Sequence, residues 1–180
     1  MAKHAGLSRG AVQKQFATKA SLFSALVAKL IADTREELRA YLVDFEPGLP
    51  RAMARMDFLW EHYKQPSAYA VMEILLGARS DKELSRRLAK VGRERNRIEE
   101  RLLGDDFEAM GIADRKAAGL AAFQMLVAVR GLALERVLTK NRKALEGAFA
   151  LQRRQTEAIF RSLMVPAAAS ESGTEAATNR

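Results

Sequence analysis

The 180-residue sequence has no cysteine, only four prolines and a single tryptophan. Without cysteine, disulfide bonds, thiolate nucleophiles and cysteine-ligated metal centres are excluded. The only histidines are His4 and His62, which also excludes a histidine-rich metal site. Because prolines are few and glycines number only 11, long uninterrupted helices are possible.

Residue patterns typical of enzymes are equally scarce. Gly6 and Gly10 are not followed by the Gly-Lys-Ser/Thr of a phosphate-binding loop. Asp105 and Asp106 follow Gly104 in a predicted turn and have no histidine near them in the sequence. We therefore expect a protein that is not an enzyme and that needs no metal or other cofactor.

Composition and charge favour a globular protein with a polyanionic partner. Hydrophobic residues make up 48% and charged residues 29% of the chain, and its length suits one domain with a small appendage. Thirty basic against 22 acidic residues give a net charge of +8, which favours a polyanionic partner such as nucleic acid or an anionic membrane over a cationic ligand. The most apolar stretch, 117–134, contains Gln124 and Arg130, so we expect no membrane-spanning helix. With no signal sequence at the N-terminus, a cytoplasmic location is expected.

Helical spacing of apolar residues runs through most of the chain, and no alternating strand pattern is present. The fold is therefore predicted to be all-α. Thr18 is expected to cap the first long helix, and Ser80 with Glu83 has the spacing of a capping box. The predicted helices cover about residues 18–43, 50–64, 67–79, 80–103, 114–139 and 142–164.

The first 29 residues carry five positive charges and no acidic residue. Within them, Ala2, Gly6 and Val12 have the spacing of a helix-turn-helix, in which the small residue permits close helix approach and the glycine forms the turn. Ser8 is placed to cap the second helix, predicted over residues 8–16. That helix presents residue types that contact phosphates and base edges, namely Arg9, Gln13, Lys14 and Gln15.

The run Gly6 to Val12 (GLSRGAV), then Phe16, then TK at 18–19 and LF at 22–23, resembles the DNA-binding signature of tetracycline-repressor-type (TetR) transcriptional regulators. The resemblance implies an all-α homodimer with an N-terminal helix-turn-helix and a larger helical domain for ligand binding and dimerisation. It also implies a repressor of a double-stranded DNA operator, released when a small hydrophobic effector binds. The implied division is 1–44 for DNA binding and the connecting helix, 45–165 for the ligand-binding domain, and 166–180 for a disordered tail.

Residue by residue, the resemblance implies that Ser8 and Lys19 hold DNA phosphates. It implies that the major groove is contacted by Arg9, Gly10, Gln13, Lys14 and Gln15. Gln13 departs from the family pattern, which usually has a tyrosine at this position. The family's first helix would precede Met1, so either the natural chain starts further upstream or this chain is a shortened relative.

Aromatic and methionine side chains predict an apolar effector pocket between helices. The candidates are Met56, Trp60, Tyr63, Tyr69, Met72 and Phe123, and plain core packing is the alternative for each. His62 is expected either to orient a ligand or to be structural. Arg130 interrupts an apolar face, and we expect it to form an ion pair with Glu135 or Glu157, or else to meet an acidic ligand.

The helix at 114–139 has a small-residue face that contains Gly119, Gly131 and several alanines. Paired with 142–164 in two subunits, it predicts a four-helix dimer interface, although a contact inside one subunit gives the same pattern. Two other functions remain open. One is a dimeric helical module that binds a small molecule and has lost DNA binding with its first helix, and the other is a nonspecific nucleic-acid-compacting protein.

Overall fold

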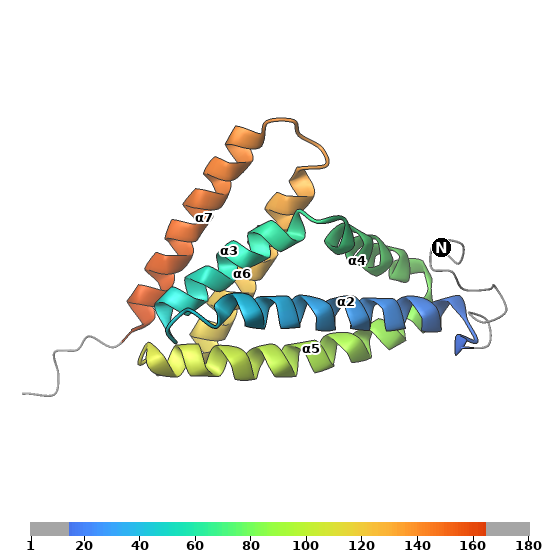
Figure 1. Cartoon of the computed structure of the whole chain (residues 1–180), viewed down its shortest axis with the longest axis horizontal. Coiled ribbons are helices and arrows are strands. Elements are labelled where there is room, and N and C mark those ends of the chain that lie inside the picture. The colour runs from blue at the N-terminus through green and yellow to red at the C-terminus, as the bar shows by residue number, and fades with distance from the viewer. Residues whose placement is uncertain (1–14, 165–180) are drawn as a thin grey trace, which may run out of the picture.

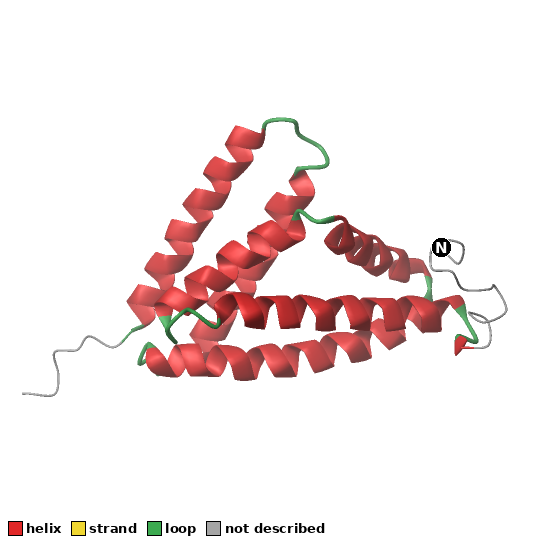
Figure 2. Ribbon diagram, viewed as in Figure 1, coloured by secondary structure: helices red, strands yellow, loops and turns green. Residues whose placement is uncertain are grey.

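A computed structural model describes residues 15–164. Within this range the chain is helical, and its only β-type pairing is an isolated bridge between Ile112 and Met164, which confirms the all-α prediction (Figure 2). The elements are α2 (Lys19–Leu42), α3 (Leu49–Tyr63), α4 (Pro66–Gly77), the 3-10 helix η2 (Ala78–Ser80), α5 (Lys82–Ala109), α6 (Arg115–Glu135) and α7 (Arg142–Leu163).

Two long helices, α2 and α5, lie side by side and run in the same direction (Figure 1). Near its start, α2 packs on α5 through a buried cluster that includes Val27 and Leu88. Near its end, α2 packs on α3 through Leu38, Leu42 and Ala54. α6 and α7 form an antiparallel pair against α3. α2 therefore extends from the start of the described chain, where it packs on α5, to α3, which packs on α6 and α7.

The start of α2 agrees with the predicted cap. The Thr18 hydroxyl accepts a hydrogen bond from the Ser21 amide at 3.1 Å, and the Thr18 amide donates to the Ser21 hydroxyl at 3.2 Å. This reciprocal pair satisfies two amides that the first turn leaves without partners. α4 begins directly at Pro66, whose missing N–H costs nothing at the first helical position.

Both predicted boundaries of α5 were wrong. Asp81 caps its start in place of Ser80, because the Asp81 carboxylate accepts from the Leu84 amide at 2.9 Å, and Ser80 lies in η2. The predicted turn at 104–106 is helical, because tertiary contacts of Asp106 and Phe107 outweigh the turn preference of the sequence. α5 ends instead at Ala109, and Gly111, which follows the C-cap residue Met110, has a φ of 65°.

The end of α5 is a Schellman motif. The Gly111 amide donates to the Glu108 carbonyl at 2.9 Å, and the Ile112 amide donates to the Phe107 carbonyl at 3.0 Å. Glycine adopts the left-handed conformation required there without a steric penalty. Ile112, 2% exposed, then enters the core.

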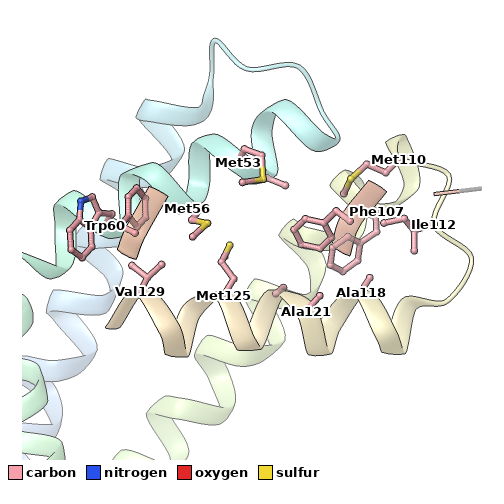
Figure 3. Close-up of a cluster of buried hydrophobic side chains, with 14 of the residues drawn as sticks. Met53, Met56, Trp60, Phe107, Met110, Ile112, Ala118, Ala121, Met125 and Val129 are labelled. Carbon is pink, nitrogen blue, oxygen red and sulfur yellow. The ribbon is translucent and has the colours of Figure 1, made fainter. Parts of the chain in front are cut away.

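The main core lies between α3, α6 and α7, and Figure 3 shows its side chains. Met56 and Trp60 of α3 meet Met125 and Val129 of α6 there. Of the small residues predicted to share a face of α6, Ala118, Ala121 and Ala122 are buried in this core, whereas Gly119 and Gly131 are exposed. The alanines therefore permit close packing of α6 within the chain, which is the alternative that the sequence left open.

Of the described helices, α6 alone is long and apolar enough to cross a membrane by length and composition. One third of its most apolar 18-residue window is buried in the fold. Its outer face exposes large apolar side chains, namely Leu120, Phe123, Val127 and Leu134. α6 thus has one side in the core and a second apolar side that the described chain leaves uncovered.

Candidate ligand-binding cavity

A cavity of about 980 Å³ lies between α2, α3, α4, α5 and α6. This volume is at the upper end of the range typical of small-molecule pockets. Most of the wall is apolar, with contributions from Leu30, Ile31, Leu59, Val71, Met72, Leu88, Val91 and Leu126. The cavity is therefore large enough and apolar enough to hold a hydrophobic small molecule.

Two hydrogen bonds join α6 to neighbouring helices, and the residues of the second, Tyr63 and Arg130, belong to the cavity wall. The Tyr69 hydroxyl on α4 donates to the Ala133 carbonyl on α6 at 2.9 Å. One terminal nitrogen of Arg130 donates to the Tyr63 hydroxyl at 3.2 Å, and the guanidinium lies 5.4 Å from the centroid of the Tyr63 ring. These contacts connect α6 to α3 and α4 on one side of the cavity.

Arg55 lies in the cavity wall with only 4% of its surface exposed. Its Nη2 lies 3.4 Å from the Asp106 carboxylate, which is fully buried and also accepts from Arg51 and from the Gly48 amide. Its Nε and Nη1 are buried and have no hydrogen-bond partner among residues 15–164. One carboxylate is thus shared by two arginines, and most of the Arg55 guanidinium remains unsatisfied.

Arg35 on α2 and Arg95 on α5 line the same cavity. The Nε atom of each is buried, and the described part of the chain supplies neither with an acceptor. Both side chains are half-buried. Buried N–H groups are almost always paired in folded proteins, so three arginines with free buried donors around one cavity form an unusual arrangement.

His62 also lines the cavity, and its Nε2 lies 3.3 Å from the Thr34 hydroxyl. Its ring stacks on that of Phe58, with centroids 6.0 Å apart. Burial lowers the pKa of His62 below its ordinary value of 6.5, and the charge of Glu37 opposes this shift only in part. His62 is therefore mainly neutral at pH 7, and a neutral ring can either donate or accept a hydrogen bond.

Three of the six predicted pocket residues line the cavity: Tyr63, Met72 and Phe123. Met56 and Trp60 do not, because they lie on the face of α3 that packs against α6 and α7. Tyr69 is absent from the wall, and its hydroxyl bonds to Ala133. The cavity is lined instead by the other face of α3, which carries Arg55, Leu59 and His62 at helical spacing.

The sequence reasoning missed the cavity arginines. Arg55 lies four residues before Leu59 and seven before His62, so a basic side chain within an apolar helical stripe was the available signal. The predicted ion pair of Arg130 was wrong, because this side chain bonds to Tyr63. Glu157 pairs with Arg161 at 2.7 Å, and the described chain gives Glu135 no ion pair.

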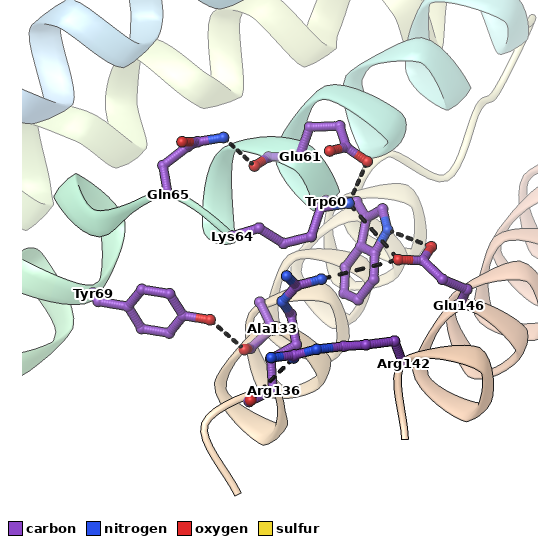
Figure 4. Close-up of polar contacts among 9 residues, drawn as sticks. All are labelled: Trp60, Glu61, Lys64, Gln65, Tyr69, Ala133, Arg136, Arg142 and Glu146. Atoms are coloured by element: carbon purple, nitrogen blue, oxygen red, sulfur yellow. Dashed lines mark hydrogen bonds and ion pairs between the residues drawn. The ribbon is translucent and has the colours of Figure 1, made fainter. Parts of the chain in front are cut away.

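A polar cluster connects α3, α6 and α7 next to the core (Figure 4). The Trp60 indole N–H donates to the Glu146 carboxylate at 3.0 Å, and the Lys64 ammonium lies 4.8 Å from the indole centroid. Lys64 and Arg136 lie 3.8 and 4.0 Å from the same carboxylate. These contacts give Trp60 a structural role at the junction of three helices.

Most of the predicted DNA-contacting residues, namely Ser8, Arg9, Gly10, Gln13 and Lys14, lie outside the described residues, as does the predicted tail at 166–180. Gln15 and Lys19 fall within the described range, and both are exposed. The Lys19 ammonium lies 5.3 Å from the centroid of the Phe23 ring at the start of α2. Comparisons with known protein families, with curated protein sequences and with solved structures give no match.

Proposed function

We propose that the protein is a ligand-controlled transcriptional regulator, in which the cavity binds an effector and the N-terminal segment binds a DNA operator. The observation that carries this proposal is the position of α2. Residues along α2, including Val27, Thr34 and Leu38, form one wall of the cavity. The same helix begins at Lys19, directly after the segment whose sequence resembles a DNA-binding helix-turn-helix.

The mechanism follows from this shared helix. A molecule that enters the cavity contacts α2. It favours the positions of α2, relative to α5, in which the cavity has room for the molecule. Movement of α2 changes the position of the predicted recognition helix at 8–16. Two recognition helices on one operator must be about 34 Å apart, so a change in their spacing weakens DNA binding. DNA and ligand then favour two different states of the same protein. The protein represses while it is bound to DNA, and the effector relieves this repression by stabilising the other state.

A homodimer is part of the proposal, and the outer face of α6 favours it. Leu120, Val127 and Leu134 are exposed there at seven-residue spacing, and Leu120 also lines the cavity. α7 exposes Ala144, Leu151 and Ala158 at the same spacing. Such heptad-spaced apolar positions are typical of helices that pack in a four-helix interface between subunits.

Selection of DNA from a random duplex pool by the full chain tests the regulator. We expect an enriched sequence with two-fold symmetry, and Arg9→Ala is expected to weaken binding to it. Arg93→Ala removes the same charge from an exposed position on α5 and serves as the matched control. Binding to every duplex with a steep salt dependence and no preferred sequence would indicate nonspecific compaction instead.

The competing function is a dimeric binding module without DNA activity. One observation favours it: the described residues of the cavity wall, from Val27 to Arg130, already enclose a space of ligand size. A chain that binds a hydrophobic ligand as a dimer, and enriches no DNA sequence in the selection, would establish this module in place of the regulator.

A further inference from the structure

The buried polar atoms without partners lie in one place. Among residues 15–164, the buried side-chain nitrogen or oxygen atoms that lack a hydrogen-bond partner are Arg35 Nε, Arg55 Nε, Arg55 Nη1 and Arg95 Nε. All of them are cationic donors, and all three arginines line the same cavity. Because an unpaired buried donor is unfavourable, this arrangement calls for an acceptor that residues 15–164 do not supply.

Acidic side chains of the described chain do not satisfy this demand. The cavity wall contains four of them, all on α5: Glu99, Glu100, Asp105 and Glu108. Glu99 is half-buried and the other three are exposed, and none lies within ion-pair distance of Arg35, Arg55 or Arg95. The fully buried Asp106 is shared with Arg51 and the Gly48 amide. The interior of the cavity is therefore cationic.

The arginines lie toward one end of the cavity. Val27 and Leu88 both belong to the buried cluster between the parallel helices α2 and α5. Arg35 is eight residues beyond Val27, and Arg95 is seven beyond Leu88, so both arginines lie about two helical turns further along their helices. Arg55 lies further still, since it contacts Asp106 near the end of α5.

The rest of the cavity suits an extended apolar chain. Its wall on α2 runs from Val27 to Leu38, which at 1.5 Å per residue is about 16 Å. The apolar side chains of the cavity wall include Leu30, Ile31, Val71, Met72, Leu88 and Val91. One end is thus apolar and the other carries cationic donors with a planar geometry that matches a carboxylate.

We propose that the effector is a long-chain monocarboxylate of the fatty acid class. Its hydrocarbon chain lies along α2 and α5 toward Val27, and its carboxylate accepts hydrogen bonds from the unpartnered nitrogens of Arg35 and Arg95, while Arg55 adds positive charge further along the same cavity. This assignment rests on the proposed ligand-binding function and specifies the chemistry of the ligand. It predicts that the affinity of a ligand depends on the negative charge of its headgroup as well as on its apolar chain.

Calorimetric titration of the full chain with dodecanoate and with dodecanol, below their aggregation concentrations, tests the proposal. The two ligands share a hydrocarbon chain and differ in the headgroup. We expect dodecanoate to bind at least about tenfold more tightly, as charge-assisted hydrogen bonds to a desolvated guanidinium require. Equal affinities would overturn the carboxylate proposal and leave the ligand-binding function standing, and no binding of either ligand would overturn both.

Variants locate the headgroup. Arg35→Gln and Arg95→Gln are each expected to weaken dodecanoate binding about tenfold and to weaken dodecanol binding much less, because a neutral hydroxyl makes no charge-assisted hydrogen bond. Arg93→Gln removes a charge from an exposed position on the same helix, outside the cavity wall, and is expected to change neither. Trp60 fluorescence checks that each variant is folded. Dodecanoate binding that survives Arg35→Gln and Arg95→Gln unchanged would overturn the proposed headgroup site.

Discussion

The indole ring of Trp60 lies flat against the phenyl ring of Phe149, with centroids 4.7 Å apart and planes inclined by 8°. This contact joins α3 to α7 inside the main core, where Trp60 is 2% exposed. Because Trp60 is the only tryptophan in the chain, its fluorescence reports directly on whether these two helices are docked.

Removal of the Phe149 ring is expected to destabilise the fold strongly. Phe149→Ala leaves a cavity beside Trp60 and is expected to lower the free energy of unfolding by about 3–5 kcal/mol. Urea denaturation followed by Trp60 fluorescence measures the change. Arg154→Ala, at an exposed position on the same helix, is expected to change the free energy of unfolding by less than about 0.5 kcal/mol. Similar effects of the two substitutions would contradict the packing described here.

Asp106 is expected to hold the start of α3 against the end of α5. Its carboxylate is fully buried and accepts from Gly48, Arg51 and Arg55. Asp106→Ala leaves buried cations without a partner and is expected to lower the free energy of unfolding by about 3–5 kcal/mol. The exposed neighbour offers a matched control, because Asp105→Ala removes the same group and is expected to have little effect. Denaturant unfolding measures the free energy of unfolding of both variants, and equal losses would contradict the role given to Asp106.

The helices were predictable from sequence because apolar spacing reports which segments can bury one face. The two errors at α5 arose where tertiary structure competes with local preference. Residues 104–106 read as a turn, yet Asp106 is bound by α3 and remains helical. Asp81 and Ser80 are both good caps, and the structure selects the carboxylate.

The cavity was harder to predict than the helices. α3 carries two apolar stripes, one with Met56 and Trp60 and another with Leu59 and His62. Both have helical spacing, so periodicity does not tell which stripe faces other helices and which faces an open space. That choice depends on where α6 and α7 pack, which is set by contacts between residues far apart in the sequence.

Acidification is expected to destabilise the protein through His62. Burial keeps its folded-state pKa below the 6.5 of an exposed histidine, so between these two values the unfolded chain binds more protons than the folded one. The contribution of His62 therefore lowers the free energy of unfolding as the pH drops through 6.5. This contribution stops changing once the pH is below the folded-state pKa of His62.

Unfolding of the parent and of His62→Gln across pH 5 to 7.5 measures this contribution. The substituted amide retains a hydrogen-bonding group near Thr34 but does not titrate. We expect the difference in stability between the two proteins to shift in favour of the variant as pH falls. A difference that stays constant over this range would show that His62 does not titrate as burial requires.

The exposed face of α6 is expected to be the dimer contact. Val127 is 48% exposed on that face, in line with Leu120 and Leu134, so Val127→Glu places a charge where a second copy would bury an apolar stripe. Sedimentation of the full chain is expected to give a dimer that Val127→Glu converts to a monomer. Val43→Glu, at a 76% exposed position where α2 ends, is expected to leave the dimer intact. A monomeric parent that binds lipid vesicles through the same stripe would instead assign this face to a membrane, because α6 also satisfies the length and composition of a spanning helix.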